Sequence, residues 1–163
     1  MSDNEIITYF NDMLARLEGL FYHEISGTAV KKVDLIGIDF LHSKKIGGKT
    51  AEEVVEKCVR EITSMGVVKN ISYSIHGHGI LLKLEIDGCI HIPKEAKLKE
   101  DGVKPFMCPI ANMIGDRIIE ILNYETTYMA NMDIDEHRGK CIVKYAIFEN
   151  IDKIGQVSDW TKL

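Results

Sequence analysis

The sequence lacks the features that mark several large classes of protein. No run of residues approaches the roughly 20 consecutive apolar residues that a membrane-spanning helix needs. Positive charge is in deficit, because 20 Lys and Arg stand against 25 Asp and Glu and leave a net charge of -5. Proteins that bind nucleic acid generally carry a basic face. We therefore expect neither a membrane span nor a nucleic-acid partner.

We also expect neither a targeting signal nor a disulfide framework. Residues 1–5 (MSDNE) are acidic, whereas a secretory signal begins with basic residues. We therefore expect a cytoplasmic protein. In a reducing compartment disulfides are rare, so the four cysteines are expected to be thiols or metal ligands.

The length of 163 residues fits one domain, and no internal repeat, linker or low-complexity segment divides it. We expect an N-terminal helix over about 4–24, a core over about 50–149 and a short C-terminal tail. Capping boxes precede two helical patterns, Ser2-x-x-Glu5 and Thr50-x-x-Glu53.

The apolar pattern predicts an α+β fold. Segment 33–41 is a short strand or edge segment, and the alternation over 71–75 and 82–86 predicts a hairpin. A loop containing Pro93 and Pro105 follows, and then Cys108-Pro109 opens a helix. A second hairpin joins Tyr128, Ala130, Met132 and Ile134 to Cys141, Val143, Tyr145 and Ile147. The order α-α-β-β-α-β-β gives an antiparallel sheet of two hairpins, separated by a helix and covered by helices.

Cysteine and histidine suggest a metal centre, with zinc as the metal, at Cys89, His91, Cys108 and Cys141. Cys89 and His91 point the same way if their segment is extended. The helix N-terminus at Cys108 favours a thiolate. His137 is a reserve ligand because it lies close to Cys141 in the sequence.

Other interpretations of these thiols remain open. Free cysteines are often small buried hydrophobes, and Cys108 is alternatively a redox or nucleophilic residue. Cys58 lies on an apolar helix stripe and is expected in the core. His76-x-His78 is expected to be a turn, and Gly47-Gly48-Lys49-Thr50 a loop and helix cap rather than a nucleotide-binding loop.

With Cys108-Pro109 at the head of a helix, Cys141 in the last strand and the ββαββ order, the chain resembles the 4-vinyl reductase domain family. This family of small hydrocarbon-binding proteins is related in fold to TRAPP vesicle-tethering subunits and haem-NO-binding domains. The resemblance covers about 50–149 and implies zinc ligation by Cys108 and Cys141. The glutamate and middle cysteine that the last hairpin usually supplies in the family have no clear match here.

The resemblance also implies a pocket for a small hydrophobic ligand and a homodimer. The expected pocket lies between sheet and helices and is lined by Phe106, Met113, Tyr128, Met132 and Tyr145, which are otherwise plain core residues. Phe10, Leu14, Leu17 and Phe21 form an apolar stripe for a homodimer of helices. A ligand-binding module is the leading hypothesis. A dimeric scaffold without ligand and a thiol enzyme using Cys108 are the alternatives.

Overall fold

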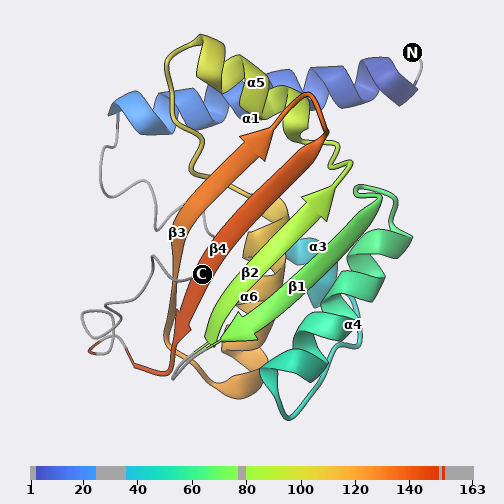
Figure 1. The fold of residues 1–163 in the computed structure, drawn as a ribbon, viewed down its shortest axis with the longest axis vertical. Helices are drawn as coiled ribbons and strands as arrows, with labels where there is room; N and C mark the ends of the chain where they lie inside the picture. The colour runs from blue at the N-terminus through green and yellow to red at the C-terminus, as the bar shows by residue number, and fades with distance from the viewer. Residues whose placement is uncertain (1–2, 25–35, 77–79, 151, 153–163) are drawn as a thin grey trace.

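The computed structural model describes residues 3–24, 36–76, 80–150 and 152. At its centre is a four-stranded antiparallel sheet with strand order β1-β2-β4-β3 (Figure 1). The strands are β1 (Asn70–His76), β2 (Ile80–Asp87), β3 (Thr126–Asp135) and β4 (Lys140–Phe148). The two predicted hairpins are therefore present, with β2 and β4 paired in the middle.

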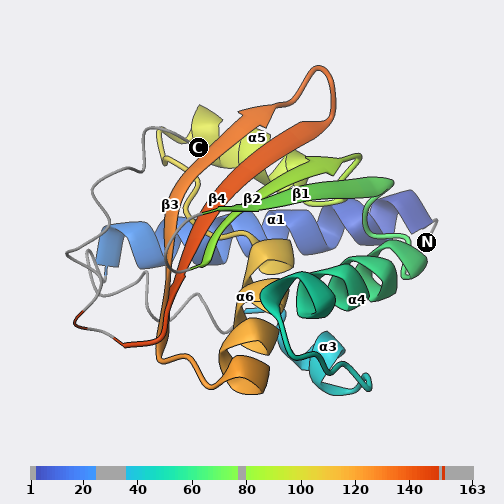
Figure 2. The same cartoon turned by 60° about the horizontal axis from the view of Figure 1, so that its bottom comes forward.

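One face of the sheet carries the main core. Alternate residues of β2 are buried, and the register places each opposite a buried residue of β4, so that Leu84 pairs with Val143 and Ile86 with Cys141. Helices α4 (Ala51–Ser64) and α6 (Pro109–Leu122) cover this face, and α3 (Asp39–His42) packs on α6 (Figure 2). The α+β class predicted from the sequence is confirmed.

Helices α1 (Asp3–Glu24) and α5 (Ile92–Glu100) lie side by side across the end of the sheet where β2 ends and β4 begins (Figure 1). They are joined by a second, small apolar cluster of Ala15, Leu98 and Val103. None of the helices in the described ranges is long and apolar enough to cross a membrane.

The Thr50 N-cap of α4 is confirmed, since its hydroxyl accepts a hydrogen bond from the Glu53 amide. The Glu53 carboxylate accepts its bond from the Lys49 amide, one residue before the position that a capping box uses. The same loop and cap account for the glycines at 47 and 48. Ser2 of the other capping box and His78 of the first hairpin tip lie outside the described residues.

Three local predictions are wrong. Helix α5 occupies part of the segment that was expected to be a loop, because Pro93 stands at the start of a helix, where a missing N–H costs nothing. Segment 33–41 is not a strand in its described part, since a helix begins at Asp39. The alternation predicted for β3 is interrupted by a bulge between Met129 and Asn131. An extra residue shifts the phase of a strand, so Tyr128 pairs with Ala146.

Close packing of α6 on the sheet depends on Gly115. A Cβ at this position would lie 2.6 Å from Cε1 of the buried Tyr145. The Tyr145 hydroxyl accepts a hydrogen bond from the Thr127 hydroxyl at 3.3 Å, so the ring is held from both sides. The space between α6 and the sheet is therefore filled by protein side chains at this level.

Two Gly-to-Ala substitutions in helices should change the free energy of unfolding in opposite directions. Gly115→Ala should destabilise the fold by about 1–3 kcal/mol through overpacking. Gly19→Ala on α1, whose Cβ would meet nothing within 4 Å, should stabilise by about 0.5–1 kcal/mol through helix propensity. Urea denaturation of both variants checks this pair. If both substitutions changed the free energy of unfolding equally and in the same direction, the packing described for Tyr145 would be contradicted.

Candidate thiol centre and buried charge cluster

Three cysteines from three different elements converge near one end of the sheet. Cys89 follows the end of β2, Cys108 is the N-cap of α6, and Cys141 is the second residue of β4. Cys108 and Cys141 are buried and Cys89 is half-buried against the same core. Cys58, in contrast, lies on α4 with no exposed surface, as expected for a core residue.

Burial dominates the electrostatics of the three thiols. Loss of solvent raises the pKa of Cys89 to about 11 and that of Cys108 to about 12, and it raises the pKa of Cys141 as well. A negative charge on Cys89 or Cys108 would raise the pKa of Cys141 further, and one on Cys89 would do the same to Cys108. The three sulfurs therefore share one buried environment and are protonated at neutral pH.

The pKa of Cys108 is raised rather than lowered, contrary to the effect expected from the helix N-terminus. The amide of Ala111, in the first turn of α6, lowers the pKa of the Cys108 thiol, but desolvation is the larger effect and raises it. A helix terminus contributes about 0.3–1 kcal/mol at exposed sites. Removal from water costs more, so Cys108 is not activated.

His91 also departs from the predicted geometry. Its backbone is helical rather than extended, and its amide lies 3.5 Å from the Cys89 sulfur. Burial and the nearby Lys94 lower the pKa of the imidazole to about 4, so it is neutral. Its Nδ1 atom is buried and has no hydrogen-bond partner. His137, the reserve ligand, is exposed on the turn between β3 and β4.

The thiols and His91 do not stand at metal-binding distance. Within the described ranges, the one group with three candidate donor atoms within 4.8 Å of one another is His42, Asp116 and Glu120. That group is largely exposed, and Arg117 donates to Glu120 at 2.5 Å. Because a guanidinium already occupies it, we interpret it as an ion-pair network.

The chemistry of the four predicted ligands nevertheless fits zinc, since three soft thiols share one environment and His91 offers an imidazole nitrogen without a partner. The zinc site stays a prediction.

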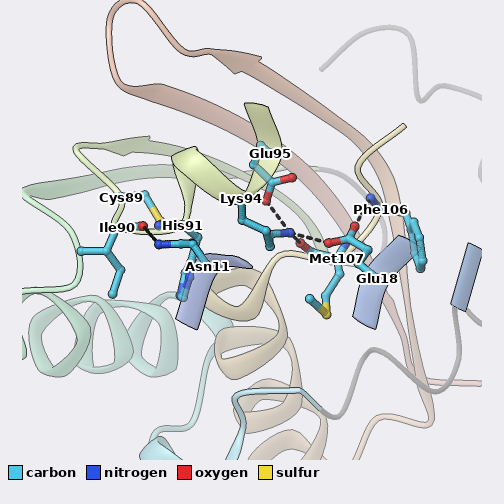
Figure 3. A network of polar contacts seen from close by, with 9 residues as sticks. All are labelled: Asn11, Glu18, Cys89, Ile90, His91, Lys94, Glu95, Phe106 and Met107. Carbon is cyan, nitrogen blue, oxygen red and sulfur yellow. Dashed lines mark hydrogen bonds and ion pairs between the residues drawn. The ribbon is translucent and has the colours of Figure 1, made fainter. Parts of the chain in front are cut away.

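A cluster of buried charges lies beside the thiols and was not predicted (Figure 3). Glu18 of α1 and Lys94 of α5 have no exposed surface, and Glu95 is 5% exposed. Lys94 Nζ lies 2.5 Å from Glu18 Oε2 and 2.6 Å from Glu95 Oε1, and it donates to the Met107 carbonyl at 3.1 Å. Isolated buried charges are costly, so each of these groups depends on the others.

The cluster divides into a fully paired carboxylate and a partly paired one. Oε1 of Glu18 accepts hydrogen bonds from the amides of Phe106 and Met107 at 2.8 and 2.9 Å. Oε2 of Glu95 is buried without a partner, and burial raises the pKa of Glu95 to about 7. Burial alone would lower the pKa of Lys94, but Glu95 and Glu18 raise it, so the amine stays protonated.

Three pockets lined by residues in the described ranges contain none of the predicted ligand-binding residues. Met113, Met132 and Tyr145 are buried in the main core, while Phe106 is half-buried near Tyr22. Only the backbone of Tyr128 belongs to the described part of the chain. A depression of about 340 Å³ lies elsewhere, between α1 and the turn after α5; its lining is Ala15, Arg16, Gly19, Leu20, His23, Asp101 and Val103.

Comparison with known proteins adds no relative. No family model matches the chain, and neither curated proteins nor solved structures give a significant match.

The buried polar residues of α1 left a weak signal in the sequence. Asn11, Ala15 and Glu18 are spaced by four and three residues and form one helical stripe without a large apolar residue. Such a stripe on an amphipathic helix ordinarily indicates the solvent side. Here it is the buried side, so periodicity alone would have assigned it wrongly.

Zinc binding at the thiols should release protons. Because Cys89, Cys108 and Cys141 are protonated in the metal-free protein, ligation should release about one proton per thiol ligand at pH 7.5. Titration of reduced protein with Zn²⁺ in weak buffer with a pH indicator measures this number, and Cys58→Ser is the control that should not change it. Binding without proton release would place the metal on carboxylates instead.

Proposed function

We propose that this chain is a self-associating interaction module whose interface is the outer face of α1. One observation supports this most strongly, which is that α1 exposes large apolar side chains and buries polar ones. Its buried residues are Asn11, Ala15 and Glu18. Its exposed large apolar residues are Ile6, Tyr9, Phe10, Met13, Leu17, Leu20 and Tyr22.

The exposed residues have the spacing of a helix-pairing seam. Ile6, Phe10, Met13, Leu17 and Leu20 are separated by four, three, four and three residues, which is the a/d pattern by which helices pack along their length. Phe10, Leu17 and Leu20 are 53%, 46% and 56% exposed. We call these five residues the α1 seam.

The α1 seam differs in part from the stripe expected for a dimer. Phe10 and Leu17 belong to both, whereas Leu14 and Phe21 are half-buried. An apolar seam of this length in water favours a partner. A second copy of the same helix is the simplest one, because identical a/d seams are complementary to each other.

Two observations argue against the other functional hypotheses, a small-ligand module and a thiol enzyme. A small-ligand module needs a cavity, and Tyr145 against Gly115 fills the space between α6 and the sheet at the level predicted for one. A thiol enzyme needs an ionised nucleophile, and burial raises the pKa of Cys108 to about 12. We therefore favour the dimeric scaffold, with zinc at the thiol centre in a structural role.

Leu17→Glu should abolish self-association. A carboxylate within the α1 seam would have to be desolvated in the dimer, so the dimer dissociation constant should rise by about 100-fold or more. Sedimentation equilibrium at micromolar concentration measures it. Met65→Glu, which replaces an exposed apolar residue at the end of α4, is the control and should leave the dimer intact. A wild-type chain that sediments as a monomer would refute the proposal.

A further inference from the structure

The inner face of α1 is fastened to the chain segment that carries two of the thiols. This segment runs from Gly88 to Cys108 and contains Cys89, His91 and α5. Exposed ion pairs between α1 and the segment join Asp12 to Lys97 at 2.7 Å and Arg16 to Asp101 at 3.6 Å. The buried contacts, in contrast, are made to backbone groups next to the cysteines.

Two buried ties hold the backbone directly beside the thiols (Figure 3). The Asn11 side-chain amide donates to the Ile90 carbonyl at 2.8 Å, and Ile90 lies between Cys89 and His91. Glu18 accepts from the amides of Phe106 and Met107, which immediately precede Cys108. Each tie therefore fixes the position of one thiol-bearing stretch of backbone.

The docked face of α1 buries few apolar residues completely. The buried apolar cluster that α1 joins is small, consisting of Ala15, Leu98 and Val103, and is separate from the main core. Tyr22 adds a ring contact with Phe106. Cys108 and Cys141 belong to the main core, which α4, α6 and the sheet complete without α1. Elements with few buried apolar contacts open at lower free energy than the rest of a fold.

We propose that α1 is a positioning helix for the thiol centre, such that its undocking frees the backbone at Cys89 and Cys108 and exposes these thiols while the rest of the main core stays folded. The α1 seam is the opposite face of the same helix. Resting here on the proposed function, we further infer that self-association through the seam restrains α1 and thereby protects the thiols.

Pulsed labelling with N-ethylmaleimide tests the positioning role. The full chain, reduced and treated with chelator, is labelled at pH 7.5 and each cysteine is quantified by peptide mass spectrometry. Cys58 in α4 serves within every molecule as the reference for global unfolding. Arg16→Ala, which removes an exposed ion pair of the same helix, is the matched control. Because an exposed ion pair contributes little to stability, this variant should change the labelling ratios far less than loss of a buried tie.

Loss of each tie should raise the labelling rate of a different cysteine. Glu18→Gln should raise the labelling rate of Cys108 relative to Cys58 by about tenfold or more, since labelling follows the population of the opened state. Asn11→Ala is milder and should act mainly on Cys89, so the test survives if Glu18→Gln fails to fold. Unchanged ratios in the folded variants, or a parallel rise at Cys58, would overturn the inference.

Leu17→Glu tests the link to assembly with both ties intact. It should raise the labelling of Cys89 and Cys108 at protein concentrations where the wild type is dimeric, and dilution of the wild type should do the same. Loss of the dimer without any change in labelling would refute the link. A wild type that is monomeric throughout would refute the proposed function, and the comparison of Glu18→Gln with Arg16→Ala would still decide the positioning role.

Discussion

The carboxylate of Glu18 is the group on which the arrangement at this end of the molecule depends. It has no exposed surface, and it accepts hydrogen bonds from two backbone amides and from Lys94. Burying a carboxylate costs several kcal/mol, and only this set of donors offsets the cost. A shift of α1 by one turn would leave Glu18 without its donors and Lys94 with only Glu95 and the Met107 carbonyl as partners, so the pair fixes the register of the helix on α5.

This constraint explains why α1 is turned with its polar stripe inward. A long amphipathic helix would ordinarily bury the α1 seam and expose Asn11 and Glu18. Because Glu18 must meet Lys94 and the amides of Phe106 and Met107, the seam faces solvent instead. The proposed interface and the charge cluster thus lie on two faces of one helix, which is why a change at one is expected to reach the other.

The sheet could be predicted from the sequence because its signals are local. Alternation over 71–75, 82–86 and 141–147 reflects burial on one face, and the hairpins follow from the short separation of the strands. The sequence does not predict helix α5, because Pro93 indicates a loop. Proline is also common at a helix start, which is its position here. The bulge at Ala130 changes the phase of β3 without any marker residue.

The candidate site could be predicted only as a set of residues. The sequence suggests that the start of β4 lies beside the start of α6, and Cys108 and Cys141 are close enough for a charge on Cys108 to raise the pKa of Cys141. The pairing of Lys94 with Glu18 could not be predicted, because the two residues lie 76 positions apart in the sequence. No periodic pattern reports contacts of that kind.

The choice between a reactive and a ligating Cys108 depends on the balance of two energies. The helix terminus supplies about 0.3–1 kcal/mol toward the thiolate, which is less than one pKa unit at 1.36 kcal/mol per unit. Burial instead raises the pKa from its ordinary value of 9.0 to about 12. A nucleophile must ionise before it meets its substrate, so this burial directly lowers its reactivity. A ligand ionises as the cation arrives, and the low-dielectric surroundings that disfavour a free thiolate strengthen its attraction to the metal. The same burial therefore argues against catalysis at Cys108 and is compatible with metal binding there.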